Sequence, residues 1–404
     1  MISVSILGLG YIGLPTALLV STKSGYRVTG IDINEQRLDL IQSGDLTLDE
    51  NDLQEVYLSA LTQKSIAFDS KLNSSDIYVV AVPTPINENK SADLSYVIDA
   101  IKNITSVLKS GQLIILESTS PIGTSSKMIE IIRTNRPDLF TDDVPDFHFT
   151  YCPERVLPGN TIFELINNDR VIGSNSKKGF SIAYSFYSSF VIGNLVSTTL
   201  ETAEASKLME NSFRDLNIAF ANEIMRFSME LGIDYKELIT ITNLHPRVNI
   251  LNPGPGVGGH CLAVDPWFLI ESSKDNTQLI QAARRINDSQ PHFIFNKYLE
   301  EIKGARQILF LGISYKKNSS DLRESPALDI LKMIIDLNLD NIFFYDPYIT
   351  NLPRSEASLQ QYQINDFTSI TPDFIIKAVD HDVFKNENFT NLINLSGGKF
   401  LELQ

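Results

Sequence analysis

Short apolar runs alternate with amphipathic stretches in the first half of the chain. The runs typical of β-strands lie at residues 4–7, 27–31, 77–82, 113–117 and 147–151. Helical periodicity separates the later runs, near residues 94–108 and 125–133. Because crossover helices connect parallel strands, this alternation predicts a mostly parallel, doubly wound sheet of the α/β class.

One long helix is predicted between residues 201 and 231, where neither Gly nor Pro occurs. Apolar side chains recur there at helical spacing, at Ala205, Leu208, Met209, Phe213, Leu216, Phe220, Ile224 and Phe227. A further strand and turn at 308–312, followed by apolar stretches at 326–335 and 341–345, predicts another α/β unit. The expected fold is therefore two Rossmann-like doubly wound α/β domains, joined by a central long helix and a small helical domain. The expected boundaries are 1–196, 197–300 and 301–404.

A glycine fingerprint marks the first strand-to-helix turn as a nucleotide site. Gly8 permits the tight turn, Gly10 lets backbone approach a pyrophosphate, and Gly13 lets helix and strand pack closely. The second strand ends at Asp32, 19 residues after Gly13, where a carboxylate accepts the ribose hydroxyls of NAD and repels a 2′-phosphate. NAD is therefore expected rather than NADP. The alternative is that Asp32 is an ordinary strand-end residue.

The net charge and the cysteine content exclude several classes of binding partner and favour one cellular compartment. The 404 residues include 34 basic and 49 acidic side chains, and the formal charge of −15 disfavours nucleic-acid binding and adsorption to anionic membranes. No apolar run outside the nucleotide-binding N-terminus is long enough to cross a bilayer. Two cysteines and no metal-spaced Cys/His cluster predict neither a disulfide framework nor a metal site, and the expected location is the cytoplasm. Cys152 ends an apolar run and is interpreted as a core thiol.

The strongest candidate nucleophile is Cys261, which lies in a glycine-dense loop at 254–265. A thiolate there can capture an aldehyde and hold it for a second hydride transfer, which a simple alcohol dehydrogenase does not need. Lys207 and Asn211 are four residues apart on the predicted long helix and so share one face, with Arg214 about one turn further. If this face borders the loop, the Lys207 ammonium stabilises both the thiolate and a substrate alkoxide. The alternative is a solvated helix lysine.

Seven stretches carry specific motifs in a fixed order along the chain: 8–15, 82–85, 117–124, 152–155, 204–211, 256–265 and 312–325. Together they resemble the nucleotide-sugar 6-dehydrogenases, the family of UDP-glucose and GDP-mannose dehydrogenases, over essentially the whole chain. Within that family, the wording Gly-Val-Gly-Gly-His-Cys-Leu-Ala-Val-Asp-Pro-Trp-Phe at 256–268 looks most like the members that oxidise UDP-N-acetyl-D-mannosamine.

The resemblance implies a role for each candidate residue. The implied catalytic set is Cys261 as nucleophile, Lys207 as acid, base or oxyanion stabiliser, Asn211 as its partner, Asp265 for water activation, and Thr119 and Glu154 beside the nicotinamide and the reacting centre. The implied cofactor contacts, beyond Gly8, Gly10 and Gly13, are Tyr11, Ile12, Asp32, Thr84, Thr119 and Arg323. The implied UDP-sugar contacts are Arg155, Val156, Lys207, Asn211, Arg214, His245, Arg247, Gly258, Tyr315 and Lys316.

The resemblance also implies a domain assignment and an assembly. Residues 1–196 are expected to bind NAD, 197–300 to carry the Cys261 loop and a dimer interface, and 301–404 to bind the UDP-sugar. A homodimer or higher homo-oligomer is expected to form through the central helix. His245 and Arg247 are then candidates to serve the neighbouring subunit's site, whereas a packed or solvent-facing His245 is the alternative.

The expected reaction is a four-electron oxidation of the C6 alcohol to a uronic acid, for synthesis of cell-surface polysaccharide precursors. Because one nicotinamide accepts two electrons as hydride, each sugar consumes two NAD. The expected course is oxidation to an aldehyde, capture by Cys261 as a thiohemiacetal, oxidation to a thioester, and hydrolysis. UDP-N-acetyl-D-mannosamine is the expected substrate, with UDP-GlcNAc, UDP-GalNAc and UDP-glucose as alternatives. Two other classes stay open, namely a hydroxyacid-type dehydrogenase that ends after one hydride and a non-catalytic sensor of NAD or nucleotide sugars.

Overall fold

The computed structural model describes residues 1–404 except 24, 47, 49, 51, 88, 157, 158, 396–398 and 404, and it describes no side chain at 388 or 395. The chain forms two compact units. Unit 1 comprises Met1–Glu210 and Trp267–Ser272, and unit 2 comprises Asn211–Pro266 and Ser273–Gln404. This division does not test the three domains expected at 1–196, 197–300 and 301–404, which stay a prediction.

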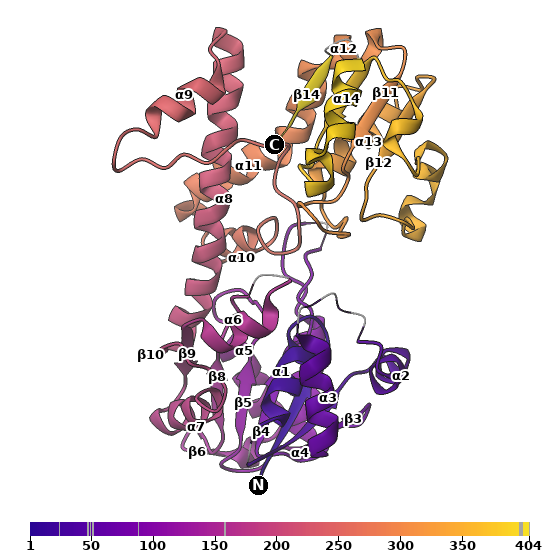
Figure 1. Cartoon of the computed structure of the whole chain (residues 1–404). Helices are drawn as coiled ribbons and strands as arrows, with labels where there is room; N and C mark the ends of the chain where they lie inside the picture. The colour runs from indigo at the N-terminus through magenta and orange to yellow at the C-terminus, as the bar shows by residue number, and fades with distance from the viewer. Residues whose placement is uncertain are drawn as a thin grey trace. The chain divides into compact units, whose positions relative to one another are not determined.

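Unit 1 is built on an eight-stranded sheet (Figure 1). In sheet order, its strands are β10 (Leu195–Thr198), β9 (Arg170–Ser174), β8 (His148–Tyr151), β5 (Leu113–Leu116), β4 (Ile77–Val80), β1 (Ile2–Leu7), β2 (Tyr26–Ile31) and β3 (Ile66–Asp69). Neighbouring strands are parallel, except that β9 is antiparallel to β8. The strand order reverses between β1 and β4, so the carboxyl ends of these two strands flank the position where open α/β sheets bind ligands.

The helices of unit 1 connect these strands. They are α1 (Gly13–Ser21), α2 (Glu35–Ser43), α3 (Leu53–Gln63), α4 (Ser95–Val107), α5 (Thr124–Asn135), η1 (Pro137–Leu139), α6 (Thr161–Asn167) and α7 (Lys177–Tyr187). A separate two-stranded sheet consists of β6 (Phe140–Thr141) and β7 (Val144–Pro145). Two further helices contain residues of both units, α8 (Leu200–Leu231) and α10 (Asp265–Ser272).

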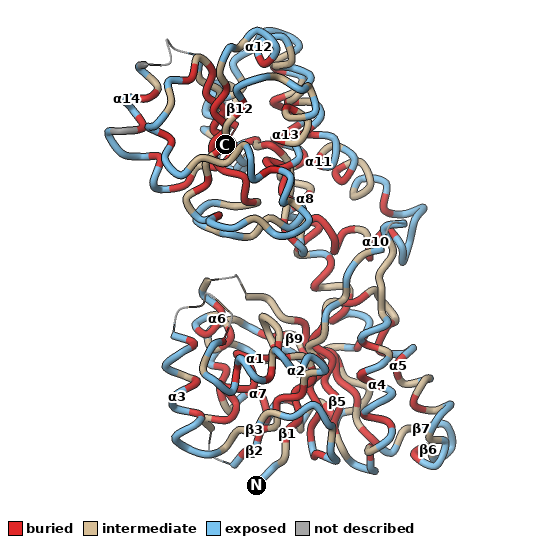
Figure 2. The backbone as a smooth tube through the Cα atoms, turned by 90° about the vertical axis from the view of Figure 1, so that its right-hand side faces the viewer, coloured by how far each residue is buried: buried red, intermediate tan, exposed pale blue. Residues whose placement is uncertain are grey.

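The central strands of the large sheet are buried on both faces, as the red strands of Figure 2 show. Along β4, Ile77 and Val79 enter one hydrophobic core, whereas Tyr78 and Val80 enter the other. The first core includes side chains of α1, α3, α6 and α7, and the second includes those of α4 and α5. Because successive strand residues point to opposite faces, a strand covered on both sides reads as a continuous apolar run.

Unit 2 contains a four-stranded parallel sheet. In sheet order, its strands are β12 (Ile342–Tyr345), β11 (Ile308–Leu311), β13 (Phe374–Lys377) and β14 (Phe400–Glu402). Its helices are α9 (Tyr235–Thr242), η2 (Lys274–Asn276), α11 (Gln278–Lys297), α12 (Leu299–Gly304), α13 (Pro326–Ile335), η3 (Arg354–Tyr362), η4 (Phe367–Ser369), η5 (Asp382–Lys385) and α14 (Glu387–Leu395). Apolar side chains of α11 and α13 pack on one face of the sheet, and those of α14 pack on the other.

The predicted α/β class with mostly parallel, doubly wound sheets is confirmed, and the long helix predicted at 201–231 is α8. Within the described ranges, no helix combines the length and the apolar character needed to cross a bilayer. The described side chains likewise include no cluster of three or more His, Cys, Asp or Glu residues suited to hold a metal ion.

Candidate active site

The glycine turn of unit 1 leaves room for a phosphate. Gly8 has a φ of +88°, which favours glycine, and a Cβ at Gly13 would lie 1.8 Å from the Gly8 carbonyl oxygen. A Cβ at Gly10, in contrast, would meet no atom within 4 Å. Gly8 and Gly13 are therefore required by the packing of β1 and α1, whereas the space beside Gly10 is open at a helix N-terminus suited to an anion.

Asp32 is tied to that same turn. Its carboxylate follows β2 and accepts hydrogen bonds from the backbone N–H groups of Leu9 and Asn34, each at 2.9 Å. Arg37 fixes the turn from the other side, because its Nε donates to the Leu9 carbonyl oxygen at 2.7 Å. A carboxylate has about four acceptor positions. Asp32 therefore retains capacity for the two ribose hydroxyls of NAD.

The remaining cofactor candidates of unit 1 follow strands of the same sheet. Ile12 precedes α1, and the Tyr11 hydroxyl accepts a hydrogen bond from Gly159 N at 2.9 Å. Thr84 and Thr119 lie in the loops after β4 and β5 and are half-buried. Because parallel strands present their carboxyl ends at one edge, the loops after β1, β4 and β5 share an edge of the sheet with the glycine turn.

Glu154 is a half-buried residue whose carboxyl group has an altered acidity. Burial raises its pKa to about 7, although the Lys207 ammonium and the Arg170 guanidinium both act to lower it. Lys207 is only 8% exposed, so the alternative of a solvated helix lysine is wrong. Glu154 also accepts a hydrogen bond from Val156 N. Unit 1 therefore pairs a carboxyl group that titrates near neutrality with a buried ammonium group.

Arg155 already has a carboxylate partner. Its guanidinium forms an ion pair with Glu210 and donates to the Asp169 carbonyl oxygen at 3.2 Å. To bind a substrate phosphate, this side chain would have to share its donors between Glu210 and the ligand.

A buried polar network lies behind Glu154 and was missed in the sequence. Glu117, directly after β5, accepts a hydrogen bond from the Tyr187 hydroxyl at 2.6 Å, and Arg170 Nη1 lies 3.7 Å from the Glu117 carboxylate. The Arg170 guanidinium also lies 4.9 Å from the centroid of the Tyr187 ring. The neighbouring Cys152 is 0% exposed, which confirms the prediction of a core thiol, and burial raises its pKa to about 11. Arg170 could have indicated this network in the sequence, because it is a charged residue at the start of an apolar strand.

In unit 2 the cysteine loop packs closely on a second loop. A Cβ at Gly258 would lie 2.5 Å from the Glu324 carbonyl oxygen, and a Cβ at Gly259 would lie 2.9 Å from the Tyr315 ring. Gly259 N also donates to the Arg323 carbonyl oxygen at 3.0 Å. The glycines are thus required because the two loops touch. They bring together the predicted segments 256–265 and 312–325.

The exposed Cys261 thiol interacts electrostatically with Tyr315 and Arg323. Burial raises the pKa of Tyr315, as do Asp321 and Cys261, whereas Arg323 and Arg214 lower it. Arg323 forms an ion pair with Asp321 at 2.6 Å. The hydrogen bond that the Arg323 guanidinium donates to Asp321 is the largest cause that raises the Arg323 pKa, and Cys261 is a smaller one. Arg323, expected at the cofactor, therefore interacts electrostatically with Cys261.

Asn211 and Asp265 form a buried pair on the same unit. Asn211 Nδ2 donates to Asp265 Oδ2 at 2.5 Å, and the two residues are 5% and 3% exposed. Asp265 N in turn donates to the Cys261 carbonyl oxygen at 2.8 Å. The turn that carries the thiol is thus joined directly to the amide and carboxylate predicted to assist catalysis.

The other substrate candidates of unit 2 are more dispersed. His245 and Arg247 are exposed in the segment after α9, where Arg247 N donates to His245 Nδ1 at 3.3 Å. Arg214 is exposed on α8, and Lys316 is half-buried.

The candidate residues thus fall into two groups. Unit 1 holds those of the glycine turn together with Thr84, Thr119, Glu154, Arg155, Val156 and Lys207, and unit 2 holds Asn211, Arg214, His245, Arg247, Gly258, Cys261, Asp265, Tyr315, Lys316 and Arg323.

The chain is similar to a known family of proteins along most of its length. Three family models match consecutive parts of the chain, all from the UDP-glucose/GDP-mannose dehydrogenase family. The NAD binding domain matches residues 2–191, the central domain matches 201–289, and the UDP binding domain matches 309–401.

Individual relatives match over nearly the full length. The chain is 40% identical to a UDP-N-acetyl-D-mannosamine dehydrogenase of Escherichia coli, with 96% of each protein covered. It is also 40% identical to an NDP-N-acetyl-D-galactosaminuronic acid dehydrogenase of Ralstonia nicotianae, with 95% of this chain and 92% of the relative covered. A solved UDP-D-ManNAc dehydrogenase from Pyrococcus horikoshii is 34% identical with a TM-score of 0.87, and 99% of each chain is covered.

The glycine turn and Asp32 lie within the residues that the NAD binding domain model matches. The loop after β11 lies within the residues that the UDP binding domain model matches. These matches cover most of the chain, and the predicted family and cofactor are confirmed. The chain belongs to the UDP-glucose/GDP-mannose dehydrogenase family and is an NAD-dependent oxidoreductase.

Proposed function

We propose that this enzyme oxidises the C6 alcohol of UDP-N-acetyl-D-mannosamine to the uronic acid, as a step in making precursors of cell-surface polysaccharides. The observation that carries the proposed chemistry is the exposed Cys261 thiol, which lies among Tyr315 and Arg323 and is joined to the Asn211–Asp265 pair. The sugar is proposed from the 40% identity to the Escherichia coli relative named for it.

In the first oxidation of the proposed reaction, side chains of unit 1 accept a proton and stabilise charge. A base takes the proton of the C6 hydroxyl as the first hydride leaves, and Glu154, with its pKa of about 7, suits this task. Lys207 stabilises the alkoxide. NAD, when bound, accepts one hydride in each of the two oxidations.

Cys261 then carries the second half of the reaction. Its thiolate adds to the aldehyde carbon, and the resulting thiohemiacetal loses the second hydride to become a thioester. Water attacks the thioester carbon, the C–S bond breaks, and the carboxylic acid and the thiolate form, after which the acid loses its proton to solvent. Asp265 takes a proton from that water, and Asn211 keeps the Asp265 carboxylate in place through its 2.5 Å hydrogen bond.

The test counts NADH and compares sugars. UDP-ManNAc, UDP-GlcNAc, UDP-GalNAc and UDP-glucose are assayed at equal concentration, and the preferred sugar is expected to yield two NADH. A Cys261→Ser variant is expected to lose two-NAD turnover, and full turnover by that variant would refute the covalent route. One NADH per sugar would identify a simple dehydrogenase, and none with any sugar would identify a sensor.

A second sugar has specific support. The relative from Ralstonia nicotianae, equally identical to this chain, is named for N-acetyl-D-galactosaminuronic acid. UDP-N-acetyl-D-galactosamine is therefore the second candidate substrate. A clear preference for it in the same assay would change the sugar and leave the reaction type standing.

We further propose that the enzyme acts in the cytoplasm as a homodimer or a higher homo-oligomer through α8. In unit 2, the α8 residues Phe213, Phe220 and Phe227 recur every seven residues and are 68%, 51% and 40% exposed. Such a stripe of exposed aromatic side chains is typical of a surface that another protein covers. Light scattering is expected to give at least twice the monomer mass, and a Phe220→Glu variant is expected to lower it.

A further inference from the structure

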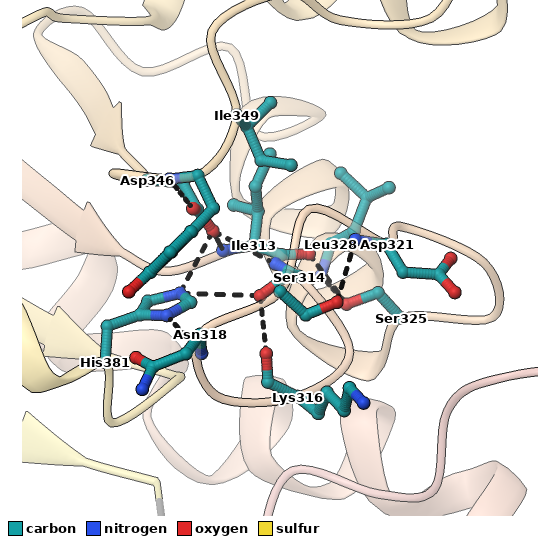
Figure 3. Close-up of polar contacts among 12 residues, drawn as sticks. Ile313, Ser314, Lys316, Asn318, Asp321, Ser325, Leu328, Asp346, Ile349 and His381 are labelled. Atoms are coloured by element: carbon teal, nitrogen blue, oxygen red, sulfur yellow. Dashed lines mark hydrogen bonds and ion pairs between the residues drawn. The ribbon is translucent and has the colours of Figure 1, made fainter. Parts of the chain in front are cut away.

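A buried polar cluster joins three loops of the C-terminal sheet. Ser314 follows β11, Asp346 follows β12 and His381 follows β13, so all three lie at the carboxyl edge of neighbouring parallel strands (Figure 3). Their exposed fractions are 0%, 4% and 0%. This edge is where open α/β sheets bind ligands, and it lies within the UDP binding model, yet the proposed reaction uses none of these side chains.

The geometry is not that of a Ser-His-Asp catalytic triad. His381 Nε2 lies 3.3 Å from Asp346 Oδ2 and 3.4 Å from Ser314 Oγ, so both oxygens face the same ring nitrogen. A triad needs the hydroxyl and the carboxylate on opposite nitrogens. The other nitrogen, Nδ1, accepts a hydrogen bond from the backbone N–H of Asn318 at 2.9 Å. His381 thus connects backbone to carboxylate.

The hydrogen bond from Asn318 also determines the tautomer of His381. Because a backbone N–H can only donate, Nδ1 carries a lone pair and the ring proton is on Nε2, directed at Asp346 and Ser314. The ring packs beside Tyr348 and Phe384, with centroids 5.0 and 5.6 Å away. A side chain held by both packing and hydrogen bonds is a rigid support.

The cluster fixes the backbone on both sides of Lys316. Asp346 Oδ2 accepts from Ser314 N at 3.2 Å, Ser314 Oγ donates to the Lys316 carbonyl oxygen at 2.9 Å, and Asn318 is held by His381. In Figure 3 the Lys316 carbonyl faces Ser314, while its side chain extends away from His381.

Lys316 differs from its neighbour Lys317 in its partners. Lys317 forms an ion pair with Asp382 at 2.6 Å, whereas no described carboxylate lies within 4.0 Å of the Lys316 ammonium. A half-buried lysine on a fixed backbone, without a carboxylate partner in the described part of the chain, is suited to an anionic ligand.

We infer that His381, in its Nε2–H form, is a positioning residue that holds the loop at 314–318 so that the Lys316 ammonium meets the diphosphate of the UDP-sugar. The inference rests on the proposed role of Lys316 in substrate binding. His381 itself does not touch the substrate in this account.

The test is calorimetric titration of the full-length enzyme with UDP, alongside steady-state kinetics. His381→Phe keeps an aromatic ring and removes the polar contacts of both ring nitrogens. It is expected to weaken UDP binding about tenfold and to raise KM for the UDP-sugar more than it lowers kcat. His381→Asn keeps an acceptor for Asn318 N and is expected to restore part of that affinity. KM for NAD is expected to stay within about twofold of the wild type.

Two lysine variants separate this inference from the site on which it rests. Lys316→Met is expected to weaken UDP binding, whereas Lys317→Met is the matched control and is expected to bind UDP normally. Normal UDP binding by Lys316→Met would overturn the assignment of Lys316 and the inference with it. If Lys316→Met binds UDP weakly but His381→Phe binds it like the wild type, the inference about His381 is overturned and the role of Lys316 stands. This holds even if His381→Phe has a lower melting temperature. If His381→Phe does not fold, His381→Asn and Ser314→Ala decide the outcome, since each is expected to weaken UDP binding a few-fold.

Discussion

The amide of Asn211 donates to the carboxylate of Asp265 at 2.5 Å, between two side chains that are almost completely buried. Asn211 lies on α8, and Asp265 begins α10 directly after the turn that carries Cys261. A buried carboxylate that accepts a hydrogen bond from a fixed amide keeps its orientation. This pair is therefore suited to direct a water molecule toward an acyl group on the neighbouring thiol.

Asp265→Asn tests that role while keeping the hydrogen bond, because the new amide oxygen still accepts from Asn211. Loss of the base is expected to lower kcat by about 100-fold or more, with hydrolysis as the slow step. A rapid burst of NADH should remain, and a substrate adduct on Cys261 should accumulate, visible by mass spectrometry of the intact protein.

The control for this variant is a second buried amide contact in unit 2. Asn222 Nδ2 donates to Asn287 Oδ1 at 3.0 Å, in residues that are 0% and 2% exposed. Asn222→Ala is expected to lower the melting temperature without accumulation of the adduct. An Asp265→Asn enzyme with normal steady-state turnover would rule out the proposed role of Asp265.

Glu154 predicts the pH dependence of the reaction. Its pKa is raised to about 7, so the carboxylate form that accepts a proton predominates only above that pH. We expect kcat/KM to rise with pH through about 7, and we expect Glu154→Gln to remove this limb along with most of the activity. A pH profile of kcat/KM under saturating NAD measures both effects.

Arg170 provides a sharper version of that experiment. Its guanidinium lowers the Glu154 pKa, so Arg170→Met is expected to move the limb to higher pH, whereas Arg170→Lys keeps the charge and should move it less. Arg136, which pairs with Asp138 on the surface, supplies the control, and Arg136→Met should leave the profile unchanged. A limb that stays in place in Arg170→Met would show that another group titrates.

Local sequence patterns predicted the parts of the structure that depend on local geometry. The strands around Ile77 and Leu113 read as strands because burial on both faces makes every position apolar. Gly8 was predicted to permit the tight turn and Gly13 to allow close packing, and both glycines have contacts that exclude a side chain, within the same turn or just after the adjacent strand β4. These properties require only neighbouring residues and a known strand period.

Contacts between distant residues could not be predicted in the same way. The Tyr187–Glu117 bond joins residues 70 apart, and the bond from Asn318 to His381 joins residues 63 apart. Lys207 illustrates the difficulty, because an isolated helix gives no reason to bury an ammonium group. Lys207 is buried because, in the folded unit 1, the part of α8 that carries it packs near Glu154. Pairing of this kind depends on the tertiary fold.

Asp32 predicts the choice between NAD and NADP. Asp32→Ala is expected to raise KM for NAD about tenfold, because two hydroxyl contacts are lost, and to improve the use of NADP, because a repulsive charge is removed. The variant also loses the hydrogen bonds to Leu9 N and Asn34 N, so its melting temperature is measured in parallel. Unchanged discrimination between NAD and NADP in a folded Asp32→Ala enzyme would mean that the carboxylate has only a structural role.

Gly10 and Gly13 predict opposite outcomes for the same substitution. Gly13→Ala would place a Cβ 1.8 Å from the Gly8 carbonyl oxygen, so we expect a loss of about 3 kcal/mol in the free energy of unfolding. Gly10→Ala would place its Cβ where no protein atom lies within 4 Å, so we expect a nearly unchanged melting temperature. Because that space is the one proposed for the pyrophosphate, Gly10→Ala should nevertheless raise KM for NAD by about tenfold or more while KM for the UDP-sugar stays the same. Thermal melts and NAD titrations of the two variants check this pair, and wild-type NAD affinity in Gly10→Ala would place the pyrophosphate elsewhere.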